Sequence, residues 1–92
     1  MFIFEWDENK ALRNLMKHGV SFGEAATVFN DPLSDVIDDP VHSAGENRYI
    51  VLGRSEVGRN LVVSFTERGD VIRIISARQM TPREKRAYEQ SL

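Results

Sequence analysis

The stretch Leu61–Arg78, LVVSFTERGDVIRIISAR, decides the fold of this chain. It holds two runs rich in β-branched residues, Leu61–Glu67 and Val71–Arg78, with Arg68-Gly69-Asp70 between them. A short break that contains glycine, placed between two such runs, is typical of a hairpin loop. Strands joined by so short a loop must be antiparallel. The stretch therefore predicts a β-hairpin.

Further strands are predicted on the N-terminal side of this hairpin. Arg48–Arg54 (RYIVLGR) is strand-like, and the break Glu56–Arg59 again has the length of a hairpin loop. Three consecutive antiparallel strands are therefore expected. Ser34–Asp38 is a shorter candidate, and the β-rich Phe2–Trp6 predicts a strand at the N-terminus.

Capping signals predict helices near both ends of the chain. Asp7 can accept hydrogen bonds from the free N–H groups of a helix over about Glu8–Lys17, and Gly19 can end that helix in the left-handed conformation. In Thr81–Glu84, threonine at N-cap, proline at N1 and glutamate at N3 predict a last helix that runs to about Gln90.

A second helix is predicted directly after the first. Ser21 and Glu24 have the spacing of a capping box, and Val20 can pack on Ala25 as a hydrophobic staple. The expected helix covers about Phe22–Phe29. The order of elements is then β-α-α-β-β-β-β-α, which favours a single α+β domain over residues 1–92, with helices packed on a mainly antiparallel sheet. The expected core comprises Phe4, Leu12, Leu15, Val28, Phe29, Ile50, Leu52, Leu61, Val63, Phe65, Ile72 and Ile74.

The composition limits the classes of function. The chain of 92 residues has no cysteine, which excludes disulfides, thiolate catalysis and cysteine-based zinc sites. The N-terminus has no basic region or cleavage site of a signal peptide, and no apolar run is long enough to span a bilayer, so we expect a cytoplasmic protein without a membrane partner.

Charge is distributed unevenly along the chain. The net charge of −2 argues by itself against a nucleic-acid binder. Residues 1–47 hold three basic and nine acidic residues, a net charge of −6, whereas residues 48–92 hold nine and five, a net charge of +4. Such asymmetry indicates a polyanionic or polar partner on part of the surface, although charges also scatter unevenly in small proteins.

The first predicted helix has one basic and one apolar side. At about 100° per residue, one arc holds Lys10, Arg13, Asn14 and Lys17, and the opposite arc holds Ala11, Leu12, Leu15 and Met16. We expect the apolar arc to be buried and the basic arc to be exposed. His18 follows at the end of the helix, where it can exchange protons near neutral pH or cap the last carbonyl groups.

The last strand brings arginine next to apolar residues. Regular alternation in VIRIISAR puts Val71, Arg73, Ile75 and Ala77 on one face, and Ile72, Ile74, Ser76 and Arg78 on the other. An arginine held there can present a fixed fork to a phosphate. Alternatively, these arginines pair with carboxylates such as Glu46 or Glu67, or extend past the edge of the sheet.

These residue types suffice for cleavage of RNA without a metal. RNA supplies its own nucleophile, the 2′-hydroxyl, so the protein needs a base, an acid and cations that stabilise the phosphorane. The two histidines, His18 and His42, lie 24 residues apart without a metal-binding motif, and we expect no metal site.

Two blocks of sequence resemble a known family over nearly the whole chain. The N-terminal block comprises FEWDENK (Phe4–Lys10), N-x-x-KHGVSF (Asn14–Phe22), Glu24-Ala25 and Phe29-x-Asp31-Pro32. The C-terminal block comprises Glu46-x-Arg48, Gly53, LVVSFTER (Leu61–Arg68), RIISAR (Arg73–Arg78) and Arg83-Glu84-x-x-Tyr88. Together these blocks resemble the BrnT toxin family.

The resemblance implies a bacterial toxin of a type II toxin–antitoxin module with a RelE-like α+β fold. It implies a metal-independent endoribonuclease without a cofactor, which arrests growth by cutting cellular RNA. A BrnA-like antitoxin would neutralise it in a heteromeric complex, and contact with DNA would be made only through that antitoxin.

The resemblance also suggests roles for individual residues. His18 is the first candidate for acid or base catalysis, and Arg78 and Arg73 would stabilise the phosphorane. Lys17 would hold RNA or share in proton transfer. The remaining candidates would orient the catalytic groups or contact RNA: Glu67, Lys10, Arg13, Arg48, Arg68 and Trp6. Alternatively, Trp6 is a core residue.

Two other functions fit the residues without the resemblance. A non-catalytic module would use the same basic surface to bind RNA or an acidic protein, and the lack of a clear second proton-transfer residue beside His18 favours it. A DNA-binding repressor is disfavoured, because the helix expected at Phe22–Phe29 is apolar and contains Glu24.

Overall fold

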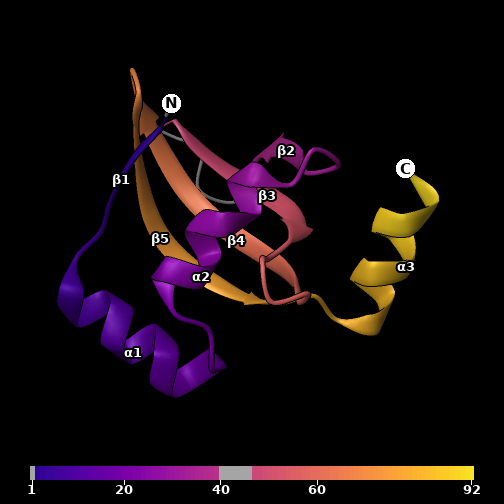
Figure 1. Ribbon diagram of the computed structural model, residues 1–92, viewed down its shortest axis with the longest axis horizontal. Coiled ribbons are helices and arrows are strands. Elements are labelled where there is room, and N and C mark those ends of the chain that lie inside the picture. The colour runs from indigo at the N-terminus through magenta and orange to yellow at the C-terminus, as the bar shows by residue number, and fades with distance from the viewer. Residues whose placement is uncertain (1, 40–46) are drawn as a thin grey trace.

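The computed structural model describes residues 2–39 and 47–92 of the chain. Within them, five strands form one sheet in the order β1-β5-β4-β3-β2 (Figure 1). The elements along the chain are β1 (Ile3–Glu5), α1 (Glu8–His18), α2 (Phe22–Thr27), a 3₁₀ turn (Val28–Asn30), β2 (Asp35–Asp38), β3 (Arg48–Arg54), β4 (Asn60–Arg68), β5 (Val71–Gln79) and α3 (Pro82–Gln90). The predicted α+β class and order of elements are confirmed. The loop predicted at His42–Asn47 and the candidate partner Glu46 lie outside the described residues, except for Asn47.

Strands β2 to β5 pair antiparallel, as predicted, and β1 is the exception. It runs parallel to β5 and pairs with it only from Ile3 opposite Val71 to Glu5 opposite Arg73. A parallel partner must arrive from a distant part of the chain, and β1 comes from the other end. Beyond Arg73, the edge of β5 has no pairing with β1 and is open to contact by α1.

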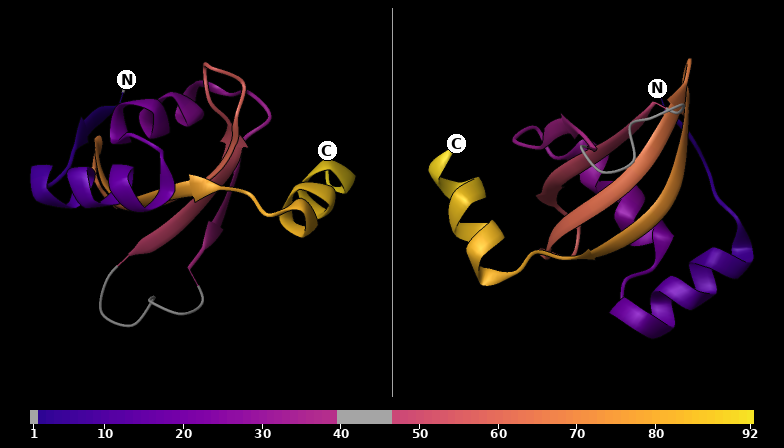
Figure 2. Two further views of the ribbon diagram at one scale, coloured as in Figure 1. Left: turned by 90° about the horizontal axis from the view of Figure 1, so that it is seen from below. Right: turned by 180° about the vertical axis from the view of Figure 1, so that it is seen from behind.

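Helix α2 lies over one face of the sheet, α1 lies beside β5 at the edge of the sheet, and α3 lies apart from both beyond the end of β5 (Figures 1 and 2). The core lies between α2, the segment before it and the covered face, and its buried residues are Val20, Phe22, Ala25, Val28, Val51, Leu61, Val63, Phe65, Ile72, Ile74 and Ala77. Of the predicted core, Phe4 and Phe29 are partly buried and pack against this cluster. Ile50 and Leu52 are half-buried.

Most of the predicted helix ends are confirmed. The Asp7 side chain accepts from the Asn9 N–H, and Gly19 ends α1 with φ of 69°. The Thr81–Glu84 capping box at α3 is complete. At α2 only half of the predicted box forms, because Ser21 accepts from the Glu24 N–H while the Glu24 carboxylate bonds Arg59 and Ser55 instead.

The predicted buried side of α1 is wrong. Leu12, Leu15 and Met16 are 59%, 45% and 80% exposed, so Leu12 and Leu15 are not core residues, whereas Asn14 is only 7% exposed. The reason is that α1 lies at the unpaired part of the β5 edge, where it meets backbone N–H and C=O groups. A carboxamide satisfies such groups and an aliphatic side chain leaves them without partners.

A β-bulge changes the predicted faces of β5. Ser64 pairs with Ser76 and Phe65 pairs with Ile74, which leaves Ile75 as an extra residue on β5. Because paired residues point to the same face, the alternation shifts by one at this position. Ile72, Ile74 and Ala77 thus lie on the covered face, and the prediction that separated Ala77 from Ile72 and Ile74 is wrong. The other face, turned away from α2, is called the outer face below.

Candidate functional site

A pocket of about 310 Å³ lies between α1 and β5. Its α1 side is strongly basic and its β5 side is the bulge. The lining residues are Lys10, Arg13, Asn14, Lys17, His18, Ile75 and Ser76. The structure therefore brings four of the predicted site residues together, and we call this the α1–β5 pocket.

The spacing of residues along α1 explains how these cations gather. Lys10, Lys17 and His18 lie four residues before, three after and four after the buried Asn14, so all four share one side of the helix. His18 is the last residue of α1 and is half-buried.

The bulge sets the composition of the β5 side. Ser76 pairs with Ser64 and Arg78 with Val62 on the outer face, and Arg73, opposite Thr66, lies on that face too. The bulge thus puts Arg73 and Arg78 on the same face, where regular alternation had predicted opposite faces. Ser76 lies between them along β5 and also lines the α1–β5 pocket.

Each of these arginines has a carboxylate partner other than those predicted. Arg73 Nη1 lies 3.6 Å from Glu5 Oε1, and both side chains are nearly half exposed. Arg78 binds Glu84 through two hydrogen bonds, Nη1 to Oε1 at 2.7 Å and Nη2 to Oε2 at 2.8 Å. The hydrogen bonds with Arg78 lower the pKa of Glu84 to about 2, and those with Glu84 raise the pKa of Arg78.

The other predicted site residues do not line the α1–β5 pocket. Glu67 and Arg68 are exposed at the end of β4, opposite Ile72 and Val71. Arg48 lies on β3, opposite Thr66 and so on the outer face.

Trp6 packs against the core, which was the alternative to a contact with RNA. It is half-buried and its ring meets that of Phe22 edge to face, with 6.0 Å between the centroids. It packs against the core and lines a second hollow, between α1 and α2, rather than the α1–β5 pocket.

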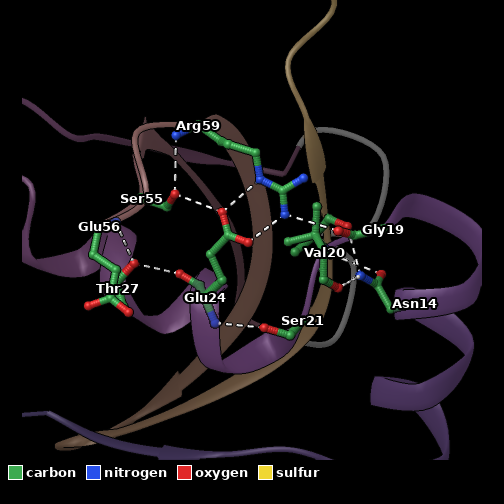
Figure 3. A network of polar contacts seen from close by, with 10 residues as sticks. Asn14, Gly19, Val20, Ser21, Glu24, Thr27, Ser55, Glu56 and Arg59 are labelled. Atoms are coloured by element: carbon green, nitrogen blue, oxygen red, sulfur yellow. Dashed lines mark hydrogen bonds and ion pairs between the residues drawn. The ribbon is translucent and has the colours of Figure 1, made fainter.

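A polar network connects the β3–β4 loop to the segment between α1 and α2 (Figure 3). Arg59 Nε donates to Glu24 Oε2 at 2.9 Å, and Arg59 Nη2 donates to Glu24 Oε1 and to the carbonyl of Gly19. The hydrogen bonds from Arg59 hold the pKa of Glu24 below its usual value. Arg59 thereby fixes the residue that directly follows His18.

Sequence reasoning missed Ser76, Asn14 and Arg59. Ser76 was assigned to the face of Ile72 and Ile74, because nothing in VIRIISAR marks the extra residue. Asn14 was grouped with the basic arc, although a short amide among long cations indicates a side chain that bonds backbone groups. Arg59 lies in a loop, and its partner Glu24 is distant in sequence.

Two further properties concern only the residues that the structure describes. They contain no group of three or more His, Cys, Asp or Glu side chains that could hold a metal ion. None of their helices combines the length and the apolar character that a bilayer crossing requires.

Comparisons with known proteins were informative for the fold and for the family. No curated protein sequence matches the chain. The fold is similar to the crystal structure of the Brucella abortus ribonuclease toxin BrnT, with a TM-score of 0.69 and 21% sequence identity, over 88% of this chain and 99% of that one. At this identity the likeness concerns the fold.

A family model matches most of the chain, including all residues that line the α1–β5 pocket. Residues 6–84 match the model of the BrnT ribonuclease toxin of type II toxin–antitoxin systems. The resemblance found in the motifs is thereby confirmed, and with it the prediction of a ribonuclease toxin. The chain belongs to the BrnT family of ribonuclease toxins of type II toxin–antitoxin systems.

Proposed function

We propose that the α1–β5 pocket is where this toxin cleaves RNA, with the 2′-hydroxyl of the RNA as nucleophile. The observation that carries the proposal is the gathering of Lys10, Arg13, Lys17 and His18 over the bulge of β5. Lys10, Arg13 and Lys17 are all the Lys and Arg residues of the acidic segment 1–47, and they lie together on one side of α1. Such a cluster attracts a phosphodiester despite the net negative charge of the chain.

The proposed reaction follows from the chemistry of RNA. A base removes the proton of the 2′-hydroxyl, the 2′-oxygen bonds to phosphorus, and the bond from phosphorus to the 5′-oxygen breaks as an acid protonates that oxygen. The products are a 2′,3′-cyclic phosphate and a 5′-hydroxyl. His18 takes part in one of these proton transfers, and Lys17 is the candidate for sharing in the other.

The arginines of the outer face extend the proposed site beyond the pocket. Arg73 and Arg78 lie on either side of Ser76 along β5, and they would stabilise the charge that develops on the phosphorane. Lys10 and Arg13 would hold the RNA backbone. Arg48 and Arg68 also lie on the outer face, through their pairing with Thr66 and Val71, and would contact RNA farther along the strand.

Cleavage of a matched pair of oligonucleotides tests this proposal. An end-labelled RNA and its fully 2′-O-methylated copy are incubated with the purified toxin in EDTA. We expect the RNA to be cut to 2′,3′-cyclic phosphate ends and the methylated copy to stay intact. Cleavage of the methylated copy would exclude the 2′-hydroxyl as nucleophile. Loss of RNA cleavage in EDTA would contradict the metal-independent mechanism.

We further propose that a BrnA-like antitoxin, acting in the cytoplasm, neutralises the toxin by covering this basic surface. Membership of a toxin–antitoxin family supports a protein partner. An acidic segment of the antitoxin would associate rapidly with Lys10, Arg13 and Lys17 and would block access of RNA at the same time. In this proposal only the antitoxin contacts operator DNA. Salt-dependent operator binding by the toxin alone would contradict that division of roles.

A further inference from the structure

Asn14 makes contacts that are unusual for a residue within a basic helix. Its Nδ2 donates to the carbonyl oxygens of Ala77 at 2.8 Å and Val20 at 2.9 Å, and its Oδ1 accepts from the Ala77 N–H at 3.1 Å. The side chain is 7% exposed, the lowest value in α1. The carboxamide therefore satisfies both backbone groups of Ala77, as a neighbouring strand would.

These contacts lie where the sheet leaves a strand edge unpaired. Pairing of β1 with β5 ends at Glu5 opposite Arg73, four residues before Ala77. The backbone groups of Ala77 that point to this edge are buried and need partners. Asn14 supplies them and so joins α1 to β5 at one defined position.

Apolar packing contributes little to this attachment of α1. Leu12, Leu15 and Met16, which would normally anchor an amphipathic helix, are exposed. Ala11 is the α1 residue that packs against the core, and its single methyl group leaves the rotation of the helix poorly defined. The three hydrogen bonds of Asn14 are directional, so they fix both the rotation of α1 and its height along β5.

We propose that Asn14 is a positioning residue of the ribonuclease site. It acts through Lys10, Lys17 and His18, which share its side of α1, and it holds them over Ile75 and Ser76 at the bulge. Both of its N–H donors are used, by Val20 and Ala77, so in this proposal it acts without contacting RNA. This inference rests on the proposed cleavage of RNA in the α1–β5 pocket.

Two variants of Asn14 test the proposal. Asn14→Ala removes the three hydrogen bonds, and Asn14→Gln keeps the amide but lengthens the side chain by one methylene, which displaces α1 from its position. We expect kcat for RNA cleavage to fall about 100-fold in both, because a displacement of roughly 1 Å between reacting groups has that effect. KM should change less than about threefold, because the cations that bind RNA remain.

Tyr88→Phe is the matched control for a merely structural effect. It removes the hydrogen bond from Tyr88 Oη to the Leu33 carbonyl, at 2.9 Å, which involves neither α1 nor β5. All kinetics are measured well below the melting temperature of each variant, with folding checked by circular dichroism. We expect Tyr88→Phe to keep the kcat of the wild type even if its melting temperature falls as far as that of the Asn14 variants.

The possible results separate the two proposals. If the wild type cuts RNA and a folded Asn14→Gln or Asn14→Ala variant keeps its kcat, Asn14 is not a positioning residue. An equal loss of kcat in Tyr88→Phe also overturns that role, since any loss of stability would then have the same effect. If the wild type binds RNA without cutting it, the proposed cleavage site fails, and the role of Asn14 fails with it.

Discussion

Arg78 and Glu84 meet end-on, with each guanidinium Nη atom bonded to a different carboxylate oxygen. Glu84 Oε1 also accepts from the Thr81 N–H and so closes the capping box of α3. One carboxylate thus both begins α3 and joins it to β5. Tyr88, one turn later in α3, donates to the Leu33 carbonyl instead, so its hydrogen bond does not involve β5. The end of β5 that carries a proposed catalytic arginine is therefore connected to the start of the last helix.

The Arg78–Glu84 pair predicts how stability varies with pH. The pKa of Glu84 is about 2 in the folded protein against 4.5 for a free side chain. A lowered pKa contributes stability above the unfolded value, and the contribution is lost as the pH falls towards the folded value. Because both side chains are more than a third exposed, we expect Glu84→Gln to cost about 1 kcal/mol at pH 7. The difference from wild type, measured by urea denaturation, should shrink between about pH 5 and pH 2. A difference independent of pH would contradict this.

Arg78→Lys tests the need for a planar fork at the end of β5. Lysine keeps the positive charge but cannot hold Glu84 and a phosphate oxygen in fixed directions at once. We expect RNA cleavage to slow about 100-fold in both Arg78→Lys and Arg78→Ala, the usual effect of losing one donor to a transition state. The measurement is single-turnover cleavage of labelled RNA by folded protein. Full activity of Arg78→Lys would show that charge alone suffices.

His18→Ala should relieve growth arrest when the toxin is expressed without an antitoxin. Loss of a general acid or base slows a reaction by roughly 100-fold or more. Binding of RNA should persist, because Lys10, Arg13 and Lys17 remain on α1. Growth curves and gel-shift assays check the two expectations. His42→Ala is the control with the second histidine of the chain. A fully toxic His18→Ala protein would show that the catalytic group lies elsewhere.

The basic side of α1 predicts a change in the salt dependence of RNA binding. Replacing Lys10, Arg13 and Lys17 by Gln would remove the three phosphate contacts proposed for these residues. The slope of log K against log salt concentration should fall by about 2 for single-stranded RNA. Association with the antitoxin should slow as well. Arg83, Lys85 and Arg86 on α3, replaced together by Gln, provide a control with the same change in net charge. Equal effects of the two triple variants would argue for the net charge rather than for the α1–β5 pocket.

Arg59→Ala should destabilise the fold more than a surface substitution does. Among the residues that the structure describes, it leaves the Glu24 carboxylate, 12% exposed, with only Ser55 as side-chain partner, and it removes a donor to the Gly19 carbonyl. Because the pKa of Glu24 is lowered in the folded protein, this stabilisation should fade as the pH falls through the range in which Glu24 takes up its proton. Thermal melting of Arg59→Ala and of Arg83→Ala, at pH 7 and at pH 3, measures the difference. Equal melting temperatures at pH 7 would contradict the role of Arg59.

Local signals in the sequence predicted the elements well. The caps at Asp7, Gly19 and Thr81 depend on residues within one turn, and the structure forms each of them. The strands Arg48–Arg54 and Leu61–Glu67 were found from β-branched residues and short breaks, and the observed strands contain both. Such features need no knowledge of distant parts of the chain.

The candidate site depended on contacts that local signals do not contain. The helical wheel of α1 assumed an apolar surface beneath the helix, whereas the helix meets the unpaired edge of β5, 63 residues away at Ala77. The faces of β5 depended on a register with β4 that no residue of VIRIISAR reveals. Lys10, Arg13, Lys17 and His18 lie together on one side of α1 as the sequence predicted, but the contacts by which the fold holds that side were not predicted.

The extra residue in β5 also constrains how this strand can change in length. Arg73 and Arg78 are separated by an odd number of positions, and only the bulge places both on the outer face. Deleting one residue at position 75 would restore regular alternation and leave the two arginines an even number apart, still on one face, but it would remove the irregularity beside Ser76. Removing the bulge by a change in β4 instead would turn Arg78 towards the core. Related strands are therefore expected to have an odd spacing between these two arginines where the bulge is present and an even spacing where it is absent.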